Sequence, residues 1–569
     1  NPYNSEAYYG LGLTLFYQRR YDEAYDAFFK ATWSNEQQEM SFYFLAAISA
    51  KKEDFLQALE FVEKGLVKNC HNVKARGLKA TILRKLGKIE EAKQWIKENF
   101  KIDPFDYISG YEAVLLTEGE EKAIKEQTLK IRMRNFPQNF IRVAIDYRES
   151  GCFEEALGIL NLCGAQWPML DYYRAACLMD MGNTEAAKKK VIIADKINPF
   201  CCFPNSLEDI AVLELAIKLQ PQLPKAYYYI GNIWYDKRQY GEAQDAWETS
   251  AKLDCTYPTV LRNLSLVYYN QSNMPEKAKE VLEKAFLLDT TDARIFLELD
   301  QLYKKLGYSV ENRIAFYEKY SETFAKRDDV FIEYITMQNF AGHHEKAYEL
   351  LMGRKFHPWE GGEGKVTTQY TTSLVELAKK AIANENYDSA KALLEKAITY
   401  PENLGEGKLE GTKDNHIYYY MGLAEKALGN VEKSKELFDK ASTGTSEPAG
   451  MMFYNDQPAD MIMFQGMALL ELGEKAASNS RFYKLISYGE VHIYDKVKMD
   501  YFAVSYPDLL IFKEDFTKKN KAHCYFLMGL GNMGLGNTKK AVECLKETLQ
   551  LEPHDLMAKL YLKSIESVW

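Results

Sequence analysis

Small and large apolar residues follow one another along the chain in a frame that repeats every 34 residues. The frame is clearest around Ala24, Ala58 and Ala92, each of which ends a phrase of an apolar residue, any residue, Glu or Gln, and Ala. In the first unit the frame also contains Tyr8, Leu11, Gly12, Leu15, Phe28 and Ala31. Two antiparallel helices approach closely only where small side chains lie at their crossing and large ones fill the grooves beside it. A fixed period of this length therefore predicts stacked helix pairs.

The frame returns from one end of the chain to the other. Further copies are marked by Ala156, Ala187, Ala243, Ala278, Ala390 and Gly529. Glycines such as Gly87 and Gly182 follow expected first helices, and prolines such as Pro104 and Pro199 follow expected second helices. We predict an all-α fold, an α-solenoid of about 14 or 15 helix pairs with long inter-repeat loops in its C-terminal third.

These positions resemble the signature of the tetratricopeptide repeat (TPR). The resemblance implies a right-handed superhelix in which the first helices form a concave surface, with a peptide or a protein edge as the usual ligand. One subclass of the family clamps a C-terminal carboxylate with Lys and Asn on first helices. Only Asn232 matches at those positions, so a clamp for chaperone tails is not expected.

The concave surface that the resemblance implies would carry a run of aromatic residues. Tyr9, Tyr43, Tyr228 and Tyr419 share one frame position on their first helices, and Asn232 lies on the same surface. Two interpretations are open. The rings form a docking stripe, since Tyr offers a large contact area at low entropic cost, or they pack on the next helix as part of the core.

The period lengthens in the C-terminal third of the chain. Extra residues fall after second helices, at about 357–367, 402–414, 443–459 and 489–519. Such loops emerge on one rim of a stack, and insertions gathered on one face often form the binding face. We divide the chain into an N-terminal array at 1–199, central and degenerate pairs at 200–356, a C-terminal array with these rim loops at 357–554, and a capping helix at 555–569.

The rim loops bring aromatic residues, carboxylates and amides together. The candidate binding residues are His357, Trp359, Glu360, Glu363, Lys365, Glu402, Asn403, Glu406, Tyr501 and Asp508. This mixture suits a saccharide, because C–H faces stack on rings while hydroxyl groups bond to fixed acceptors. The alternative is that the aromatic residues anchor the loops on the helices beneath and that the glycines allow the turns.

The net charge and the absence of known motifs argue against several classes of function. The formal charge of −9 argues against nucleic acid as a partner. We find no apolar run of the roughly 18 residues that a membrane span needs, no phosphate-loop, nucleophile-elbow or dinucleotide motif, and no metal-ligand spacing among the eight His. No catalytic residue, cofactor or metal is predicted. The nine Cys are typical of thiols in a reducing compartment, so we expect the cytoplasm, or the periplasm if a signal peptide preceded Asn1.

A second, narrower resemblance covers mainly residues 200–569. Segments 357–370, 400–408 and 500–512 are similar to the C-terminal half of a family of large bacterial proteins, in which a galactose-mutarotase-like β-sandwich precedes a TPR array. The resemblance implies that this chain is the helical half of a larger, carbohydrate-related protein. We expect a non-enzymatic scaffold for protein or interdomain docking; the alternative is a saccharide-binding or catalytic site in the rim loops.

Overall fold

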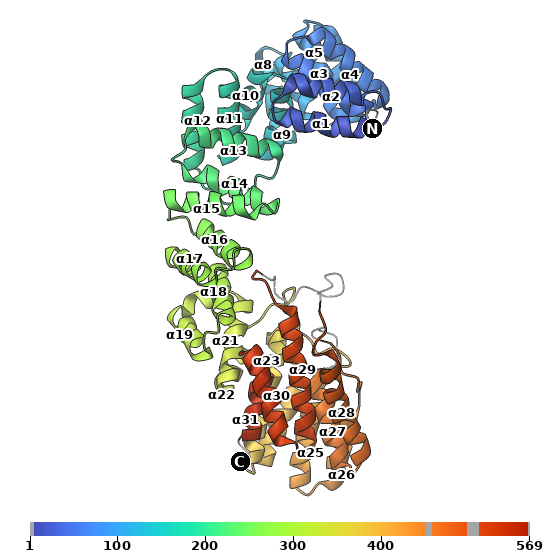
Figure 1. Cartoon of the computed structure of the whole chain (residues 1–569), viewed down its shortest axis with the longest axis vertical. Coiled ribbons are helices and arrows are strands. Elements are labelled where there is room, and N and C mark those ends of the chain that lie inside the picture. Colours follow the sequence, from blue (N-terminus) through green and yellow to red (C-terminus); the bar gives the residue numbers. More distant parts are fainter. Residues whose placement is uncertain (1–4, 451–457, 498–510, 567–569) are drawn as a thin grey trace. The chain divides into compact units, whose positions relative to one another are not determined.

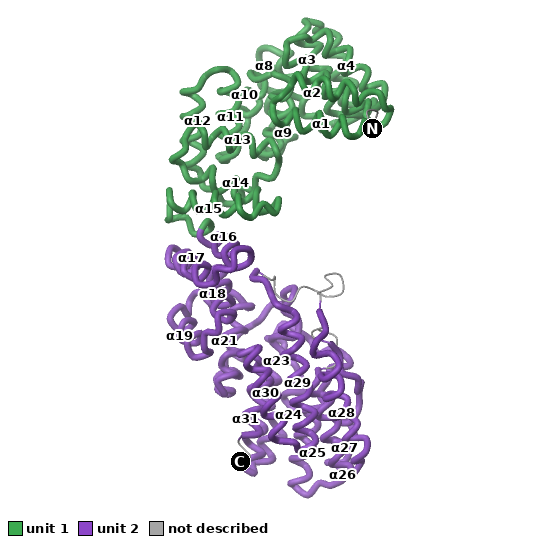
Figure 2. Tube along the Cα trace, in the orientation of Figure 1, with its two compact units in different colours: residues 1–260 green, residues 261–569 purple. Residues whose placement is uncertain are grey.

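The computed structural model describes residues 5–450, 458–497 and 511–566. These residues form α-helices joined by turns and by several longer loops, with one 3-10 helix and no strand (Figure 1). The all-α solenoid of helix pairs that the sequence predicts is confirmed. The chain divides into two compact units, residues 1–260 and residues 261–569 (Figure 2).

The first unit contains consecutive helices that pair antiparallel. They are α1 (Ser5–Tyr17), α2 (Tyr21–Ala31), α3 (Gln38–Lys51), α4 (Phe55–Lys68), α5 (Val73–Lys85), α6 (Ile89–Ile102), α7 (Tyr107–Leu115), α8 (Gly119–Arg132), α9 (Pro137–Glu149), α10 (Phe153–Leu162), α11 (Pro168–Asp180), α12 (Thr184–Lys196), α13 (Leu207–Leu219), α14 (Pro224–Asp236) and α15 (Tyr240–Leu253). Helix α16 (Pro258–Asn270) begins at the end of this unit and continues into the second.

The second unit continues the same arrangement. Its helices are α17 (Pro275–Leu288), α18 (Ala293–Lys305), α19 (Val310–Lys319), α20 (Ser321–Phe324), α21 (Asp328–Ala341), α22 (His344–Met352), α23 (Lys365–Ala383), α24 (Tyr387–Ala397), the 3-10 helix η1 (Glu402–Leu404), α25 (Asn415–Ala427), α26 (Val431–Ser442), α27 (Ala459–Glu471), α28 (Lys475–His492), α29 (Phe516–Gly534), α30 (Thr538–Leu551) and α31 (Leu556–Glu566).

One contact sets the spacing of the helices in many pairs. A Gly or Ala on the first helix is followed 16 residues later by a large side chain on the second, as in Gly12 with Phe28 and Gly231 with Trp247. A Cβ atom added at Gly231 would lie 2.5 Å from the Trp247 indole. The same spacing recurs in Ala46/Val62, Ala80/Ile96, Ala144/Leu160, Ala175/Val191, Ala378/Leu394, Gly422/Phe438, Gly466/Phe482 and Gly529/Leu545.

Residues from distant parts of the second unit meet at its C-terminal end. Helix α31 packs on α30 and also contacts α21. The Tyr561 hydroxyl donates to the Asp460 carboxylate at 2.9 Å, and the Lys559 ammonium lies 5.9 Å from the centre of the Phe340 ring. Near the other end, Asn270 bonds to the backbone of Ile511 and of Lys513, each at 2.8 Å. These contacts bind the array to itself over more than 200 residues of sequence.

We predict that Gly231→Ala destabilises the first unit by about 1–3 kcal/mol, because overpacking forces the Trp247 indole away from Gly231. The indole Nε1 would also be displaced from the Tyr228 carbonyl and the Asn232 side chain, which it contacts at 3.2 and 3.1 Å. Urea unfolding followed by circular dichroism measures the change. The control is Gly241→Ala on the paired helix α15, where nothing lies within 4 Å of the added atom; equal destabilisation by both variants would contradict the packing rule.

The second unit should lose stability in mild acid. Burial lowers the pKa of His416 to about 3, whereas the unfolded chain binds this proton near pH 6.5. The stabilisation is therefore complete above pH 6.5 and falls as the pH drops toward 3, by up to about 2 kcal/mol at pH 5. We expect His416→Phe, at a position beside Phe464, to reduce this pH dependence in urea unfolding at pH 7 and pH 5. The exposed control His71→Phe should leave it unchanged; an unaltered pH profile for His416→Phe would refute the assignment.

Candidate functional site

A charged pocket of about 160 Å³ lies in the first unit, where the ends of several helices meet. Arg19 comes from the turn between α1 and α2, Tyr21 begins α2, Lys51 ends α3, and Asp180 ends α11. The remaining lining residues are Ile145, Arg148 and Glu149 of α9, Phe153 of α10 and Glu208 of α13. All of these residues belong to the first compact unit.

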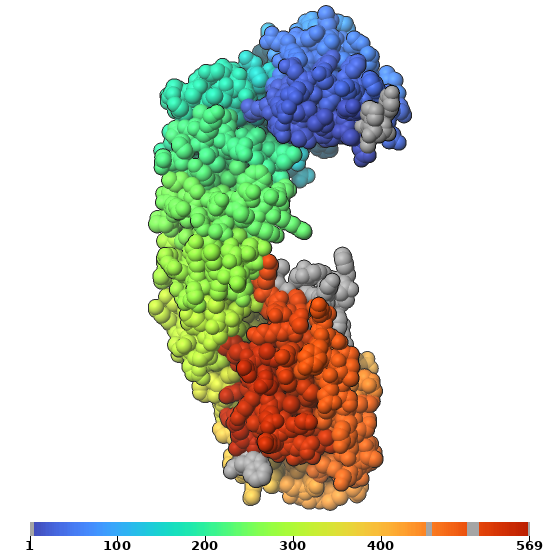
Figure 3. Space-filling view, in the orientation of Figure 1, coloured from blue at the N-terminus to red at the C-terminus, as the bar shows by residue number. Residues whose placement is uncertain are grey.

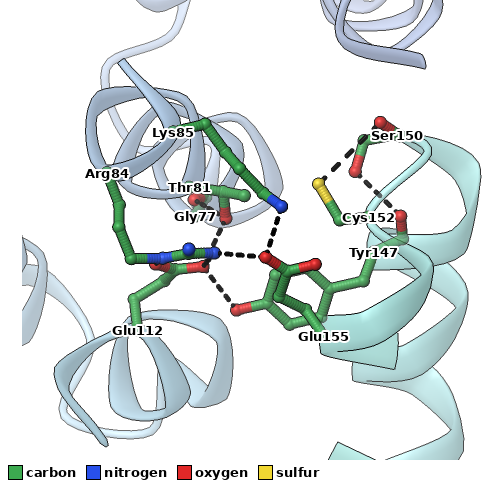
Figure 4. A network of polar contacts seen from close by, with 9 residues as sticks. All are labelled: Gly77, Thr81, Arg84, Lys85, Glu112, Tyr147, Ser150, Cys152 and Glu155. Atoms are coloured by element: carbon green, nitrogen blue, oxygen red, sulfur yellow. Dashed lines mark hydrogen bonds and ion pairs between the residues drawn. The ribbon is translucent and has the colours of Figure 1, made fainter. Parts of the chain in front are cut away.

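A buried polar network in the same unit links neighbouring repeats. Figure 4 shows the Arg84 guanidinium of α5 between Glu112 of α7 and Glu155 of α10. Lys85 contacts Glu155 at 2.6 Å, and the Tyr147 hydroxyl of α9 donates to Glu112 at 2.9 Å. A buried carboxylate is costly unless it is paired and hydrogen-bonded. The two carboxylates therefore need α5, α7, α9 and α10 in one arrangement.

This arrangement brings helix α3 directly against α9, although two repeats separate them in the chain. The Lys51 ammonium donates to the Arg148 carbonyl at 3.1 Å. Gly151 lies so close that an added Cβ would be 2.8 Å from the Lys51 Cα, and its φ of +77° also favours glycine. In the space-filling view the blue surface of the first helices meets the cyan surface of the segment around α9 (Figure 3).

One end of the pocket is positively charged. Arg148 and Arg19 both face Asp180, with nitrogen–oxygen distances of 2.5 and 3.8 Å. The Lys51 ammonium lies 4.9 Å from the centre of the Tyr21 ring and 4.8 Å from that of Phe153. Burial lowers the pKa of Lys51 to about 8. Each cation at this end therefore has a partner: a carboxylate, or rings and a carbonyl oxygen.

Two further carboxylates line the pocket, Glu149 and Glu208, and the Asp146–Lys74 ion pair lies outside its lining. Lys74 of α5 contacts Asp146 at 2.7 Å, and the Tyr17 hydroxyl donates to Glu208 at 3.1 Å. No hydrogen-bond donor in the described part of the chain contacts the Glu149 carboxyl group. Burial, together with the charges of Asp146 and Glu208, raises the pKa of Glu149 to about 8.

The aromatic candidates for the concave surface lie in the core. Tyr43, Tyr228 and Tyr419 are buried, with 4%, 5% and 6% of their surfaces exposed. Tyr9 is half-buried and packs near Phe28 and Phe44. The Asn232 side chain bonds to the Trp247 indole. This geometry favours the packing interpretation of these residues over a docking stripe.

The first two rim loops are fastened to each other. The Glu406 carboxylate accepts from the Gly364 amide at 3.0 Å, and burial raises the pKa of Glu406. Asn403 accepts from the Phe356 amide at 2.8 Å and donates to two carbonyls of the preceding repeat. The Trp359 indole packs on the core and over Gly362. These three side chains therefore anchor the loops.

The other rim candidates are placed differently. His357 bonds to Asp328 through its amide at 2.9 Å, while its side chain is 77% exposed. Glu360, Glu363 and Glu402 are exposed, and Lys365 is half-buried. Tyr501 and Asp508 lie outside the described residues, as do parts of the third and fourth loops.

Sequence reasoning did not identify the pocket, although one signal was available. The position five residues after the small residue of the first helix is charged in several repeats of the first unit: Lys51, Lys85, Glu149 and Asp180. Three of these four line the pocket. Charged residues at one frame position of a superhelix face the same side. The sequence could therefore have predicted that these charged side chains lie on one face, but not which of them form a pocket together.

No group of three or more His, Cys, Asp or Glu suited to a metal ion occurs among residues 5–450, 458–497 and 511–566. Within those same ranges, the helices are too short or too polar to cross a membrane.

Comparisons with known proteins give one family match and several similar structures. Residues 73–106, which contain α5 and α6, match the model of the tetratricopeptide repeat. The yeast Tom70 structure is 16% identical, with 82% of this chain and 96% of that chain covered and a TM-score of 0.23. The TPR domain of P58(IPK) is also 16% identical (76% and 99% covered, TM-score 0.22), and the Cut9–Hcn1 hetero-tetramer of APC/C is 13% identical (99% and 96%, TM-score 0.24). The chain is an all-α solenoid of helix pairs, and its residues 73–106 match the tetratricopeptide-repeat model.

Proposed function

We propose that the chain is a non-enzymatic scaffold that binds a segment of another protein, with the charged pocket of the first unit as the docking site. The observation that carries this proposal is the meeting of helix ends from several repeats around one cavity. Helix-pair solenoids with this repeat act through such surfaces by presenting side chains from successive repeats.

The pocket suits part of a peptide in size and rigidity. Its volume of about 160 Å³ is roughly tenfold the 10–15 Å³ that one water molecule needs on the same measure, so the pocket can admit a side chain. Tyr21 and Phe153 form apolar walls of the pocket, and the charged lining residues would orient a bound peptide side chain. The network around Arg84 holds the surrounding helices in place, so binding requires little ordering of the scaffold.

Selection from a display library of random twelve-residue peptides tests this proposal on the full chain. We expect enriched peptides that bind with micromolar affinity and lose at least about fivefold in affinity with Arg19→Gln, because removal of a pocket charge weakens a charged contact. The matched control is Arg20→Gln, since Arg20 pairs with Glu23 and does not line the pocket. Failure to enrich any peptide, or equal binding by the Arg19→Gln variant, would reject the proposal.

We also propose that the rim loops dock a neighbouring domain, the galactose-mutarotase-like β-sandwich implied by the C-terminal resemblance. The mutual anchoring of loops 357–367 and 402–414 supports this proposal, since it forms one platform that bears exposed side chains. Leu409, with 78% of its surface exposed, is an apolar contact on that platform. A saccharide at the same rim is the alternative ligand.

We expect a separately produced sandwich domain of that family to bind the chain in calorimetry, and Leu409→Ser to weaken binding at least about tenfold by removing buried apolar area. Val67→Ser is the control, at a position that is 83% exposed in the first unit. Unchanged binding by Leu409→Ser would contradict the docking proposal. If D-galactose or D-glucose instead raises the unfolding temperature, and Trp359→Ala abolishes that shift, the saccharide alternative replaces it.

A further inference from the structure

We propose that a surface at the C-terminal end of α8, in the first unit, docks on an anionic lipid membrane. This α8 surface consists of Phe105, Lys130, Ile131, Arg132, Arg134 and Phe136. None of these residues lines the charged pocket, so the inference goes beyond the proposed function and does not depend on it. Exposed apolar side chains, cations without carboxylate partners and the outward direction of both support it.

Helix α8 buries little of its surface for its length. Of its 14 residues only Leu129 is buried, whereas the following helix α9 buries six. Ile124 and Ile131 are seven residues apart and therefore lie on one face of the helix. They expose 65% and 67% of their surfaces. An apolar face of this kind is open to a partner outside the chain.

The loops next to this helix end add two aromatic rings. Phe105, in the loop before α7, and Phe136, in the loop after α8, expose 62% and 54% of their surfaces. Contacts at the end of α8 join it to the first loop: Arg132 donates to the Pro104 carbonyl, and the Tyr107 hydroxyl donates to the Arg132 carbonyl, each at 3.3 Å. Exposed aromatic and aliphatic side chains of this kind insert at the boundary between lipid headgroups and acyl chains.

Three cations lie beside these apolar side chains, Lys130, Arg132 and Arg134. No ion pair joins any of the three to a carboxylate within the described part of the chain. The helix macrodipole favours basic residues at a helix C-terminus, which accounts for Lys130 and Arg132. It does not account for Arg134, which is exposed beyond the helix end with a φ of +54°. Free cations next to exposed apolar side chains suit a phase that is anionic outside and apolar beneath.

Nearby carboxylates do not cancel this positive charge. Asp103 accepts from the Phe105 amide at 2.8 Å, and the buried Asp106 accepts from Ser109. The carboxylates of α8 itself lie before this end of the helix, at Glu120, Glu121 and Glu126. The whole chain has a formal charge of −9, but at physiological ionic strength exposed charges interact over only about 8 Å. The local cations therefore determine the attraction to an anionic surface.

The direction of the side chains favours a membrane over an acidic segment of another protein. Ile131, Phe105 and Phe136 are each more than half exposed, so they project outward instead of lining a cleft. Proteins usually hold a peptide in a concave site or along the edge of a sheet. A lipid interface accepts projecting side chains without a groove that fits them.

Sedimentation of the full chain with lipid vesicles tests this inference. One set of vesicles contains phosphatidylcholine alone, and the other contains equal parts of phosphatidylcholine and phosphatidylserine. We expect the chain to sediment with the mixed vesicles and to stay in solution with the neutral ones. Binding should fall at about 1 M salt, where the screening length is about 3 Å. No binding to the mixed vesicles at low salt, or equal binding to both sets, would overturn the inference.

Variants locate the membrane contact on the α8 surface. Arg134→Glu should weaken vesicle binding at least about fivefold, because each cation near an anionic surface contributes about that factor. The matched control is Arg238→Glu, since Arg238 is also exposed in a turn of the first unit and has a φ of +60°. Undiminished binding by a folded Arg134→Glu variant, or an equal loss with Arg238→Glu, would contradict the assignment.

The apolar part of the contact has its own variant. Phe105→Ser combined with Phe136→Ser should weaken vesicle binding at least about tenfold by removing apolar area that enters the lipid. The control is Leu56→Ser, at a position of α4 that is 70% exposed. Circular dichroism checks that each variant is folded. Full binding by the folded double variant would overturn the inference.

A soluble peptide of alternating Glu and Leu residues tests the acidic protein segment as the other ligand. If this peptide binds the chain in fluorescence anisotropy, loses binding with Arg134→Glu, and no vesicle binds, a protein segment replaces the membrane and the inference is wrong. The display selection with Arg19→Gln tests the pocket separately, because Arg19 is not part of the α8 surface.

Discussion

A small residue on the first helix of a pair faces a large residue that lies 16 positions later on the second helix, and the close approach of the two helices depends on this contact. Gly422 and Gly466 leave no room for a Cβ beside Phe438 and Phe482, with distances of 2.6 and 2.5 Å. Because interiors are packed to crystal-like density, a methyl group at such a position changes the crossing of the pair. Each pair then offers the next one a constant surface, and a solenoid follows.

Polar interactions modify that regular stack in the first unit. Glu112 and Glu155 are buried between repeats and are paired with Arg84, Lys85 and Tyr147. Because these buried carboxylates must be paired, the repeats that contribute their partners are held in one relative orientation. The ends of α3 and α9 come into contact as a result, and charged groups that would be solvated on a straighter array enclose a pocket instead.

The type of a candidate residue did not by itself reveal its role in the structure. The tyrosines of the concave frame position lie on first helices, and the rings of Tyr43, Tyr228 and Tyr419 pack in the core. Glu406, Asn403 and Trp359 combine carboxylate, amide and ring as a saccharide site would, and each is engaged by backbone groups or core side chains of the loops. A loop on a rim needs such anchors to bury its polar backbone. Among the candidate rim carboxylates that the structure describes, Glu360, Glu363 and Glu402 are exposed.

The repeat, the helix pairs and their small-to-large packing could be predicted from the sequence, because these depend on contacts within about 34 residues that each unit makes in the same way. The sequence also located the glycines that end first helices, such as Gly87 and Gly182, both with positive φ. Only the tertiary structure decided that Lys51, Glu149, Asp180 and Glu208 share a pocket. Their meeting depends on small angles accumulated over several repeats and on a polar network between them, neither of which a local pattern records.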